Sequence, residues 1–489
     1  MSKKPARFLQ IVSICAILIS GLLAPIFKPV KAEEVVLGAA DSIGEVQKSL
    51  LIAKPAVVQV TDIIKGEIII QAVAASDLGA PSLSGMTYNF SFAFGGSGFF
   101  LTSDGYLVTN GHVAKPGENL IAYYGIAQQA EFIFKDALAA VLRDSYGVYD
   151  FTDAELDSAY QKAINDSYGG DVMNLVNELY NNFRQGYLKI EGIKRSNYIQ
   201  TGAVAGSEKL VIELGKAATL IDTRYEGDTD SSDLALLKVE GSNFPTVNLG
   251  SSVNVQIGKE IYAIGYPAIV ESGTGVFTDV ESELEPSITK GIVSAKKKLV
   301  DGTEAFQTDA GISHGNSGGP VVDTDGSVIG VATWGFGDEP GGESFNFLIS
   351  VEEVKKLLTK NNVQQQESIT SKKWASALTN YINKCYSSAK SEFEEVRNLY
   401  KDNVDVDSFI TKSQESISKG EDVCAVSTTT VLVVVVVVCL GLIIAAAVVV
   451  FILLKRRKKP TEEQPVASGT EKSTESEPKP EKFKKEKEV

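Results

Sequence analysis

The chain of 489 residues is long enough for two or three domains, and 44% hydrophobic with 22% charged residues is typical of a globular protein. The formal net charge is −15, and residues 33–454 alone carry about −23, because residues 1–32 and 455–489 are net basic. A central part this acidic argues against a nucleic-acid partner. The four cysteines form no CxxC or Cys/His cluster, so we expect neither a metal site nor a cofactor.

Both ends of the chain carry membrane-targeting patterns. Residues 1–32 combine a basic start, an apolar stretch and a small residue at Ala32, which predicts a secretory signal peptide, with an uncleaved signal anchor as the alternative. From Val431 to Leu454 no residue is charged, and this length spans a hydrocarbon core of about 30 Å. The basic cluster at 455–459 favours the cytoplasmic side. We therefore predict a single-pass type I protein of the cell membrane, with a transmembrane helix over 431–454 in the lipid bilayer.

The segments on either side of that helix differ in character. The tail over 455–489 is rich in Glu, Lys, Pro and Ser and is expected to be disordered and cytoplasmic. Residues 33–430 are expected outside the cytoplasm.

The exported part begins with strands. Between about 54 and 109 the sequence has β-branched runs at 56–60 and 68–70, separated by turn residues. The Asp104–Gly105 pair between apolar runs predicts a hairpin. Strand character returns over 218–333, with a second hairpin at 323–326. Many short strands with regular turns indicate an antiparallel barrel or sandwich.

Two regions are helical instead. Over about 125–190, apolar residues at helical spacing and a capping box from Thr152 to Glu155 predict an insertion of two or three helices. Over 361–430, a stripe including Trp374 and Tyr381 predicts a helical stalk near the membrane, with a recognition module as the alternative. Cys385 and Cys424 both lie in this exported segment and are candidates for a disulfide.

The sequence SHGNSGGP at 313–320 contains a candidate nucleophile, Ser317. A serine needs a base to take its proton and a third group to fix that base. The chain has two histidines: His112 follows a predicted strand, and His314 lies in the serine loop. Asp233 directly precedes the apolar strand at 234–237. The order His112, Asp233, Ser317 is that of a chymotrypsin-type triad.

Other interpretations of these residues stay open. The alternative for Ser317 is a structural turn in an inactive protease relative. Asp228 and Asp230 are rivals of Asp233, which the junction with the apolar strand favours. A calcium loop over 228–233 is rejected, because the loop lacks the required Gly and Glu. His314 is expected as an exposed loop residue, or as a pH-sensitive neighbour of the serine loop.

Further motifs in the same order make the chain resemble the trypsin-like serine proteases of the HtrA/DegP type. The resemblance covers about residues 50–355, and its motifs lie at 54–58, 96–99, 109–114, 233–238, 263–267, 288–295 and 307–320. It implies an all-β core of two six-stranded antiparallel β-barrels, in a protease domain over 45–360 with the site between the barrels. It also implies His112 as general base, Asp233 as its orienting carboxylate and Ser317 as nucleophile. The N–H groups of Gly315 and Ser317 would form the oxyanion hole.

The same resemblance implies which residues bind the substrate. Thr333, Trp334 and Gly335 match the segment on which such enzymes lay the substrate backbone as an added strand. Gly311 stands where trypsin has its specificity aspartate, so an aliphatic rather than a basic P1 residue is expected.

The chain also departs from the family. The helical insertion lengthens the segment between His112 and Asp233, where it could gate the cleft, bind a partner or merely decorate a loop. No PDZ domain is expected over 360–430, so peptide sensing through such a domain is not carried over. A homo-oligomer remains an open expectation.

Two functional hypotheses result. The first is a membrane-anchored extracytoplasmic serine endopeptidase that cleaves unfolded or exported polypeptides through an acyl-enzyme intermediate. The second is a catalytically inactive protease-like ectodomain that serves as a sensor, adhesion or binding module.

Overall fold

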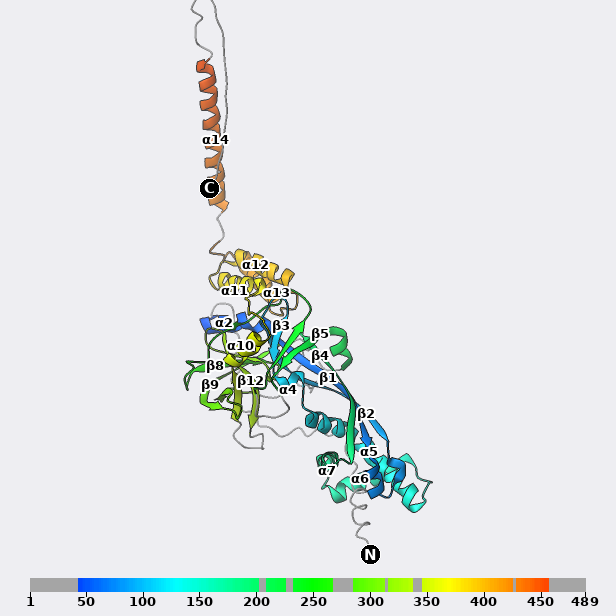
Figure 1. Cartoon of the computed structure of the whole chain (residues 1–489). Coiled ribbons are helices and arrows are strands. Elements are labelled where there is room, and N and C mark those ends of the chain that lie inside the picture. The colour runs from blue at the N-terminus through cyan, green and yellow to red at the C-terminus, as the bar shows by residue number, and fades with distance from the viewer. Residues whose placement is uncertain are drawn as a thin grey trace, which may run out of the picture. The chain divides into compact units, whose positions relative to one another are not determined.

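The computed structural model describes residues 43–201, 208–225, 232–266, 285–312, 315–336, 345–424 and 428–456. The chain divides into two units, Met1–Cys424 and Ala425–Val489 (Figure 1). The expected signal peptide at 1–32, His314 and the tail beyond residue 456 lie outside the described residues.

The first half of the protease region forms a closed six-stranded antiparallel barrel. Its strands follow the order β1-β2-β3-β6-β5-β4. The expected hairpin at Asp104–Gly105 joins β2 to β3, with Gly98 opposite Thr109. Val58, Val60, Phe100, Leu107 and Leu237 lie in its core. The strands are β1 (Val57–Ile70), β2 (Thr87–Phe100), β3 (Tyr106–Thr109), β4 (Leu188–Gln200), β5 (Lys216–Thr223) and β6 (Ala235–Val239).

The second barrel is closed by β11, which pairs with both β8 and β12. The expected hairpin at 323–326 joins β11 to β12, and Asp323 Oδ1 accepts hydrogen bonds from the N–H groups of Asp325 and Ser327. A short strand, β7, adds in parallel to β12. The prediction of two six-stranded barrels is thus confirmed. The strands are β7 (Asn248–Leu249), β8 (Glu260–Gly265), β9 (Ser287–Lys298), β10 (Glu304–Thr308), β11 (Pro320–Val322), β12 (Ser327–Phe336) and β13 (Phe345–Ser350).

The strands β1, β2 and β4 extend beyond the first barrel as a three-stranded arm. Where the sequence predicts two strand runs separated by a turn, β1 is continuous, because its pairing with β2 runs unbroken from Val57 to Ile69. The turn residues between Lys65 and Glu67 only shift the register against β4. Residues 71–86, expected within a region of strands, instead contain the helices α3 (Ala72–Asp77) and η3 (Pro81–Leu83) at the end of the arm.

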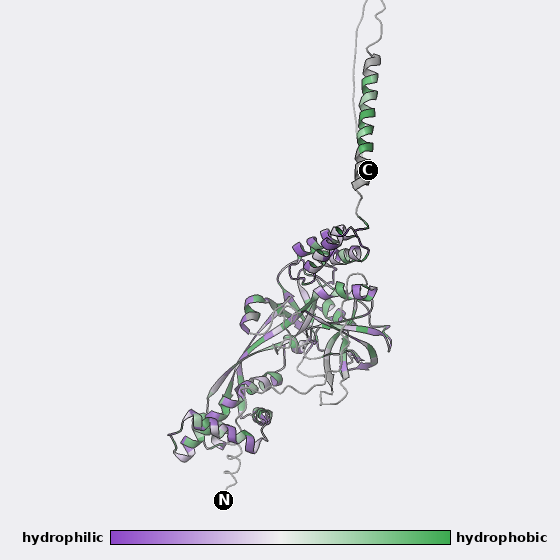
Figure 2. Ribbon diagram, turned by 180° about the vertical axis from the view of Figure 1, so that it is seen from behind, coloured by the Kyte–Doolittle hydropathy of each residue, from purple (hydrophilic) through white to green (hydrophobic). Residues whose placement is uncertain are grey.

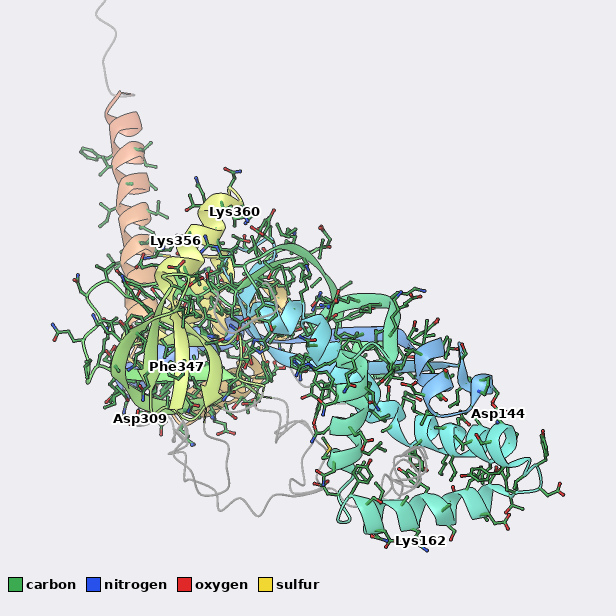
Figure 3. The ribbon with its side chains drawn as sticks, turned by 60° about the horizontal axis from the view of Figure 1, so that its bottom comes forward. Asp144, Lys162, Asp309, Phe347, Lys356 and Lys360 are labelled. Atoms are coloured by element: carbon green, nitrogen blue, oxygen red, sulfur yellow. A yellow bond between two sulfur atoms is a disulfide. The ribbon has the colours of Figure 1, made fainter. Side chains whose placement is uncertain are left out.

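Three helices cover the arm, where the sequence predicts two or three. They are α5 (Glu118–Tyr146), α6 (Asp153–Ser167) and α7 (Val172–Arg184). The capping box at the start of α6 forms as predicted, since Thr152 Oγ1 accepts from Glu155 N–H and Glu155 Oε2 accepts from Thr152 N–H. Apolar side chains of helices and arm strands share one core, separate from those of the barrels. Figure 3 shows Asp144 and Lys162 on these helices, with Asp309 and Phe347 on the second barrel.

The segment for which the sequence predicts a helical stalk packs against the barrels, in the same compact unit. Trp374 Nε1 donates a hydrogen bond to Leu51 O at 2.7 Å, and the buried Lys54 forms an ion pair with Asp405. Cys385 and Cys424 form a disulfide. The remaining helices of this unit are α2 (Glu45–Ala53), η2 (Lys54–Ala56), α4 (Gly111–Ala114), α8 (Glu208–Leu214), α10 (Val351–Lys360), α11 (Ile369–Ile382), α12 (Tyr386–Leu399) and α13 (Val406–Ser418).

The second unit contains one helix, α14 (Thr428–Arg456), which includes the segment predicted to span the membrane. It is coloured as strongly hydrophobic along most of its length in Figure 2. The structure describes the side chains of α14 over 436–451 only, and within the described residues no helix is long and apolar enough to cross a membrane.

Candidate active site

His112 lies on α4, the single helical turn that follows β3. Its position depends on close packing, because a Cβ on the preceding Gly111 would lie 2.1 Å from the Cβ of Tyr225. Asn110, buried just before the turn, donates a side-chain hydrogen bond to Asp233 O at 2.7 Å. This hydrogen bond therefore ties the start of the helical turn to Asp233, the residue predicted to orient His112.

Asp233 receives three hydrogen bonds at its carboxylate. His112 N–H donates to Oδ1 at 2.9 Å, His112 Nδ1 lies 2.5 Å from Oδ2, and Thr333 Oγ1 donates to Oδ2 at 2.6 Å. Burial alone would raise the pKa of Asp233, but the charge of His112 and these hydrogen bonds hold that pKa below its usual value. An ionised carboxylate in this place fixes the orientation of the imidazole. The rivals Asp228 and Asp230 lie outside the described residues.

Ser317 lies next to this pair but its hydroxyl has a different partner. Ser317 Oγ donates to Thr333 O at 2.7 Å. Among the described residues, no hydrogen bond joins Ser317 Oγ to His112. Thr333 therefore connects the two halves of the predicted triad, because its side chain binds Asp233 and its carbonyl binds Ser317.

The turn that carries Ser317 requires glycine. Gly318 has a φ of +87°, and a Cβ there would lie 2.1 Å from Ser97 O and 2.4 Å from Thr109 Oγ1. The turn of the second barrel is thus pressed against strands β2 and β3 of the first barrel. The N–H groups of Gly315 and Ser317 remain the predicted oxyanion donors.

Ser97 is a residue of the site that the sequence did not single out by itself. It is fully buried, its N–H donates to Ser317 O at 2.7 Å, and its hydroxyl donates to Gly315 O at 2.7 Å. Tyr266 N–H donates to the same hydroxyl. The signal in the sequence was a small polar residue between glycines within a family motif, and its partners Gly315 and Ser317 lie more than 200 positions away.

The predicted substrate residues lie along the second barrel. Gly311 is exposed, and its carbonyl accepts a hydrogen bond from Thr289 Oγ1 at 2.8 Å. Trp334 and Gly335 belong to β12, where the register against β13 shifts between Ala332 and Gly335. The side chain of Trp334 lies outside the described residues.

Two aromatic rings flank His112. The rings of Phe94 on β2 and of Tyr225 each have their centroid 6.2 Å from that of the imidazole, in edge-on arrangements. Sequence patterns gave no indication of these contacts. In the part of the chain that the structure describes, no cluster of three or more His, Cys, Asp or Glu side chains is arranged to hold a metal ion.

Comparison with known proteins shows which part of the chain is similar to a known family. Residues 199–331, which include Asp233 and Ser317, match the family model of the trypsin-like peptidase domain. This part of the chain therefore resembles a trypsin-like peptidase domain, and its curated relatives are described as DegP-like serine endoproteases. A probable periplasmic DegP-like serine endoprotease of Pseudomonas putida (strain W619) is 29% identical over 197 residues, which cover 39% of this chain and 37% of that protein. A protein of the same description from Pseudomonas fulva (strain 12-X) is 34% identical over 163 residues, covering 32% and 31%.

The trypsin-like peptidase domain therefore accounts for part of the molecule only. The chain spans about a third of the length of the curated relatives it matches. A solved structure described as the HtrA-type protease AlgW with decapeptide aligns with a TM-score of 0.34 and 19% identity, over 64% of this chain and 66% of that one.

Proposed function

We propose that the protein is a serine endopeptidase that hydrolyses polypeptides through an acyl-enzyme intermediate, with His112, Asp233 and Ser317 as its catalytic residues. The observation that carries the proposal is the hydrogen bond of 2.5 Å between His112 Nδ1 and the buried carboxylate of Asp233. This contact leaves Nε2 as the acceptor of a proton, since Nδ1 carries the hydrogen that Asp233 binds. Thr333 further supports it by holding Ser317 beside the pair.

In the proposed reaction, the Ser317 hydroxyl turns from Thr333 O to His112 Nε2, a rotation about one side-chain bond. Oγ attacks the scissile carbonyl carbon while Nε2 takes the hydroxyl proton. The imidazolium then gives this proton to the departing amine, which leaves an ester between the acyl group and Ser317. A water molecule, deprotonated by His112, hydrolyses the ester and restores both side chains.

The developing oxyanion is assigned to the N–H groups of Gly315 and Ser317. Ser97 supports this assignment as a positioning residue, because it holds the carbonyl oxygens of both residues through its own N–H and hydroxyl. These two carbonyls share their peptide planes with the N–H groups of Asn316 and Gly318, which flank the peptide group that carries the Ser317 N–H. Ser97 therefore holds the turn on both sides of one proposed donor.

For the substrate, we assign the backbone on the acyl side of the scissile bond to Thr333, Trp334 and Gly335 on β12. Gly311 contributes no charge, so an aliphatic side chain is the proposed P1 residue. Unfolded or exported polypeptides are the proposed substrates, because relatives of the domain are described as periplasmic endoproteases.

We also assign the protease to the outside of a membrane. The support comes from the basic and apolar start of residues 1–32, from the uncharged segment Val431 to Leu454 and from the basic cluster that follows it. The segment lies within the helix α14.

A second candidate function is a catalytically inactive ectodomain that binds polypeptides without cleaving them. The observation that favours it is the hydrogen bond from Ser317 Oγ to Thr333 O, which occupies the hydroxyl that an active triad directs to His112.

A fluorophosphonate probe applied to the purified full chain separates the two functions, since it reacts only with an activated serine. We expect labelling of the wild type, none of Ser317→Ala, and a loss of at least about a thousandfold in labelling rate for His112→Ala. His314→Ala, which removes the other histidine, is the matched control and keeps the wild-type rate. An unlabelled wild type, or a labelled Ser317→Ala variant, contradicts the endopeptidase.

A further inference from the structure

A strip of aromatic side chains begins beside His112 and crosses the arm. We call it the aromatic strip. Successive ring centroids lie 6.2 Å apart from His112 to Phe94, then 6.0, 5.9, 5.5 and 6.0 Å apart along the strip. Phe92 contacts the same Tyr124 ring at 5.8 Å. The members are Phe92 and Phe94 on β2, Tyr123 and Tyr124 on α5, and Tyr180 and Phe183 on α7.

The aromatic strip is only partly used for packing. Five of the six rings rest against the buried core of the arm, yet none is fully buried. The sixth residue, Tyr124, is 43% exposed and contacts the rings of Phe92, Phe94 and Tyr123. Aromatic side chains that leave such a continuous edge in solvent next to a reactive group are typical of a binding surface.

We propose that the aromatic strip binds the leaving-group side of the polypeptide substrate, through large apolar side chains beyond the scissile bond. This inference rests on the endopeptidase activity proposed above. The acyl side of the substrate is assigned to β12 of the second barrel, so the other side must leave the site over the first barrel. His112, which protonates the leaving amine, lies there, and the strip starts at its ring.

The spacing of the strip fits an extended peptide. Alternate side chains of an extended chain point to the same side and recur about every 6.6 Å. The rings of the strip lie 5.5 to 6.0 Å apart, so each ring can meet every second side chain of the substrate. A substrate that follows the strip to Phe183 therefore extends roughly eight to ten residues beyond the scissile bond.

This role also explains the position of the helical insertion. Tyr123, Tyr124, Tyr180 and Phe183 all lie between His112 and Asp233 in the sequence, within the segment that lengthens the barrel connection. The insertion thereby places Tyr124 against Phe94, the ring that contacts His112. Its helices α5 and α7 pack in the core of the arm.

The test maps cleavage sites of the full chain in a library of peptides from a digested proteome, by mass spectrometry. In the wild type we expect Phe, Tyr, Leu or Met enriched at alternate positions on the leaving-group side, by about two- to tenfold per ring contact. Tyr124→Ser should abolish the enrichment at the position that meets Tyr124, the ring after Phe94 along the strip. Phe183→Ser should abolish only the enrichment furthest from the scissile bond. Phe132→Ser, an aromatic residue of α5 that is 60% exposed and outside the strip, is the matched control and should change neither.

The outcomes separate this inference from the proposed activity. A wild type that cleaves nothing and takes no fluorophosphonate refutes the endopeptidase itself. A wild type that is labelled and cleaves without leaving-group preference, or a preference that survives Tyr124→Ser, overturns the aromatic strip alone. A Tyr124→Ser variant that loses an oligomeric state in light scattering while its preference is kept would show that the strip covers a second copy of the chain, which also overturns the proposal.

Discussion

Thr333 offers the sharpest test of how the site is held together. Its side chain is 1% exposed and donates one hydrogen bond, to Asp233 Oδ2 at 2.6 Å, while its backbone carbonyl accepts from Ser317. Thr333→Val removes the side-chain hydrogen bond and keeps the shape of the side chain and the backbone carbonyl. The substitution therefore separates the support of Asp233 from the placement of Ser317.

A hydrogen bond to a buried charged group contributes about 1.5–3 kcal/mol, and the variant should lose about 2 kcal/mol in free energy of unfolding. The pKa of Asp233 lies below its usual 3.8 and should rise in the variant, because one of the hydrogen bonds that lower it is gone. The contribution of Asp233 to stability is fully present above about pH 4 and is lost as the pH falls through its folded-state pKa. The difference in stability between wild type and variant should therefore shrink below pH 4.

For catalysis we expect kcat/KM to fall by about tenfold, equivalent to about 1.4 kcal/mol, because a less firmly held carboxylate orients His112 less well. The assay is kcat/KM against pH with a cleavable peptide, together with the free energy of unfolding from denaturant titration. Thr246→Val is the matched control, since Thr246 is also buried and its Oγ1 accepts one hydrogen bond, from Ser368 N–H, away from the site. The control should lose stability and keep kcat/KM. A Thr333→Val variant that behaves like the control refutes the reasoning.

Three further changes test other parts of the structure. Burial raises the pKa of Asp62 to about 7, so its contribution to stability is lost as the pH rises from about 4 through 7. Asp62→Asn should therefore remove about 3 kcal/mol of the fall in unfolding free energy between pH 5 and 8, and equal pH slopes would contradict this. Gly318→Ala should abolish fluorophosphonate labelling, because its Cβ has no room beside Ser97 O; a variant labelled at the wild-type rate would disprove it. Cys385→Ser opens a disulfide with a sequence separation of 39 and should cost about 4 kcal/mol in unfolding free energy, with added reductant producing no further loss.

The sequence was a good guide wherever structure is decided locally. The hairpins at 104–105 and 323–326 and the capping box at Thr152 depend on neighbouring residues, and all three form as predicted. The order of His112, Asp233 and Ser317 led to the residues that the structure brings together around Thr333. The resemblance to a family predicted two closed barrels, whereas the pattern of short strands and turns did not distinguish a barrel from a sandwich.

What the sequence missed depends on contacts between distant segments. Lys65 to Glu67 has the composition of a turn, yet pairing with β2 holds β1 in one strand. Ser97 has no distinguishing pattern, because its partners in the loop at 315–317 lie far along the chain. The predicted stalk has the pattern of an independent bundle. Its contacts with residues near the other end of the exported part, such as those of Trp374 with Leu51 and of Asp405 with Lys54, show where the bundle packs.

In the candidate site, each barrel holds a group of the other barrel that we propose to act in catalysis. Thr333 belongs to the second barrel and holds the carboxylate of Asp233 on the first. Ser97 belongs to the first barrel and holds the carbonyls of Gly315 and Ser317 on the second. Because all of these groups are buried or nearly so, a shift of one barrel against the other would leave unpaired polar atoms in both halves at once. The hydrogen bonds that hold the residues of the proposed triad therefore also oppose any separation of the barrels, so the geometry of the site depends on how the two barrels pack.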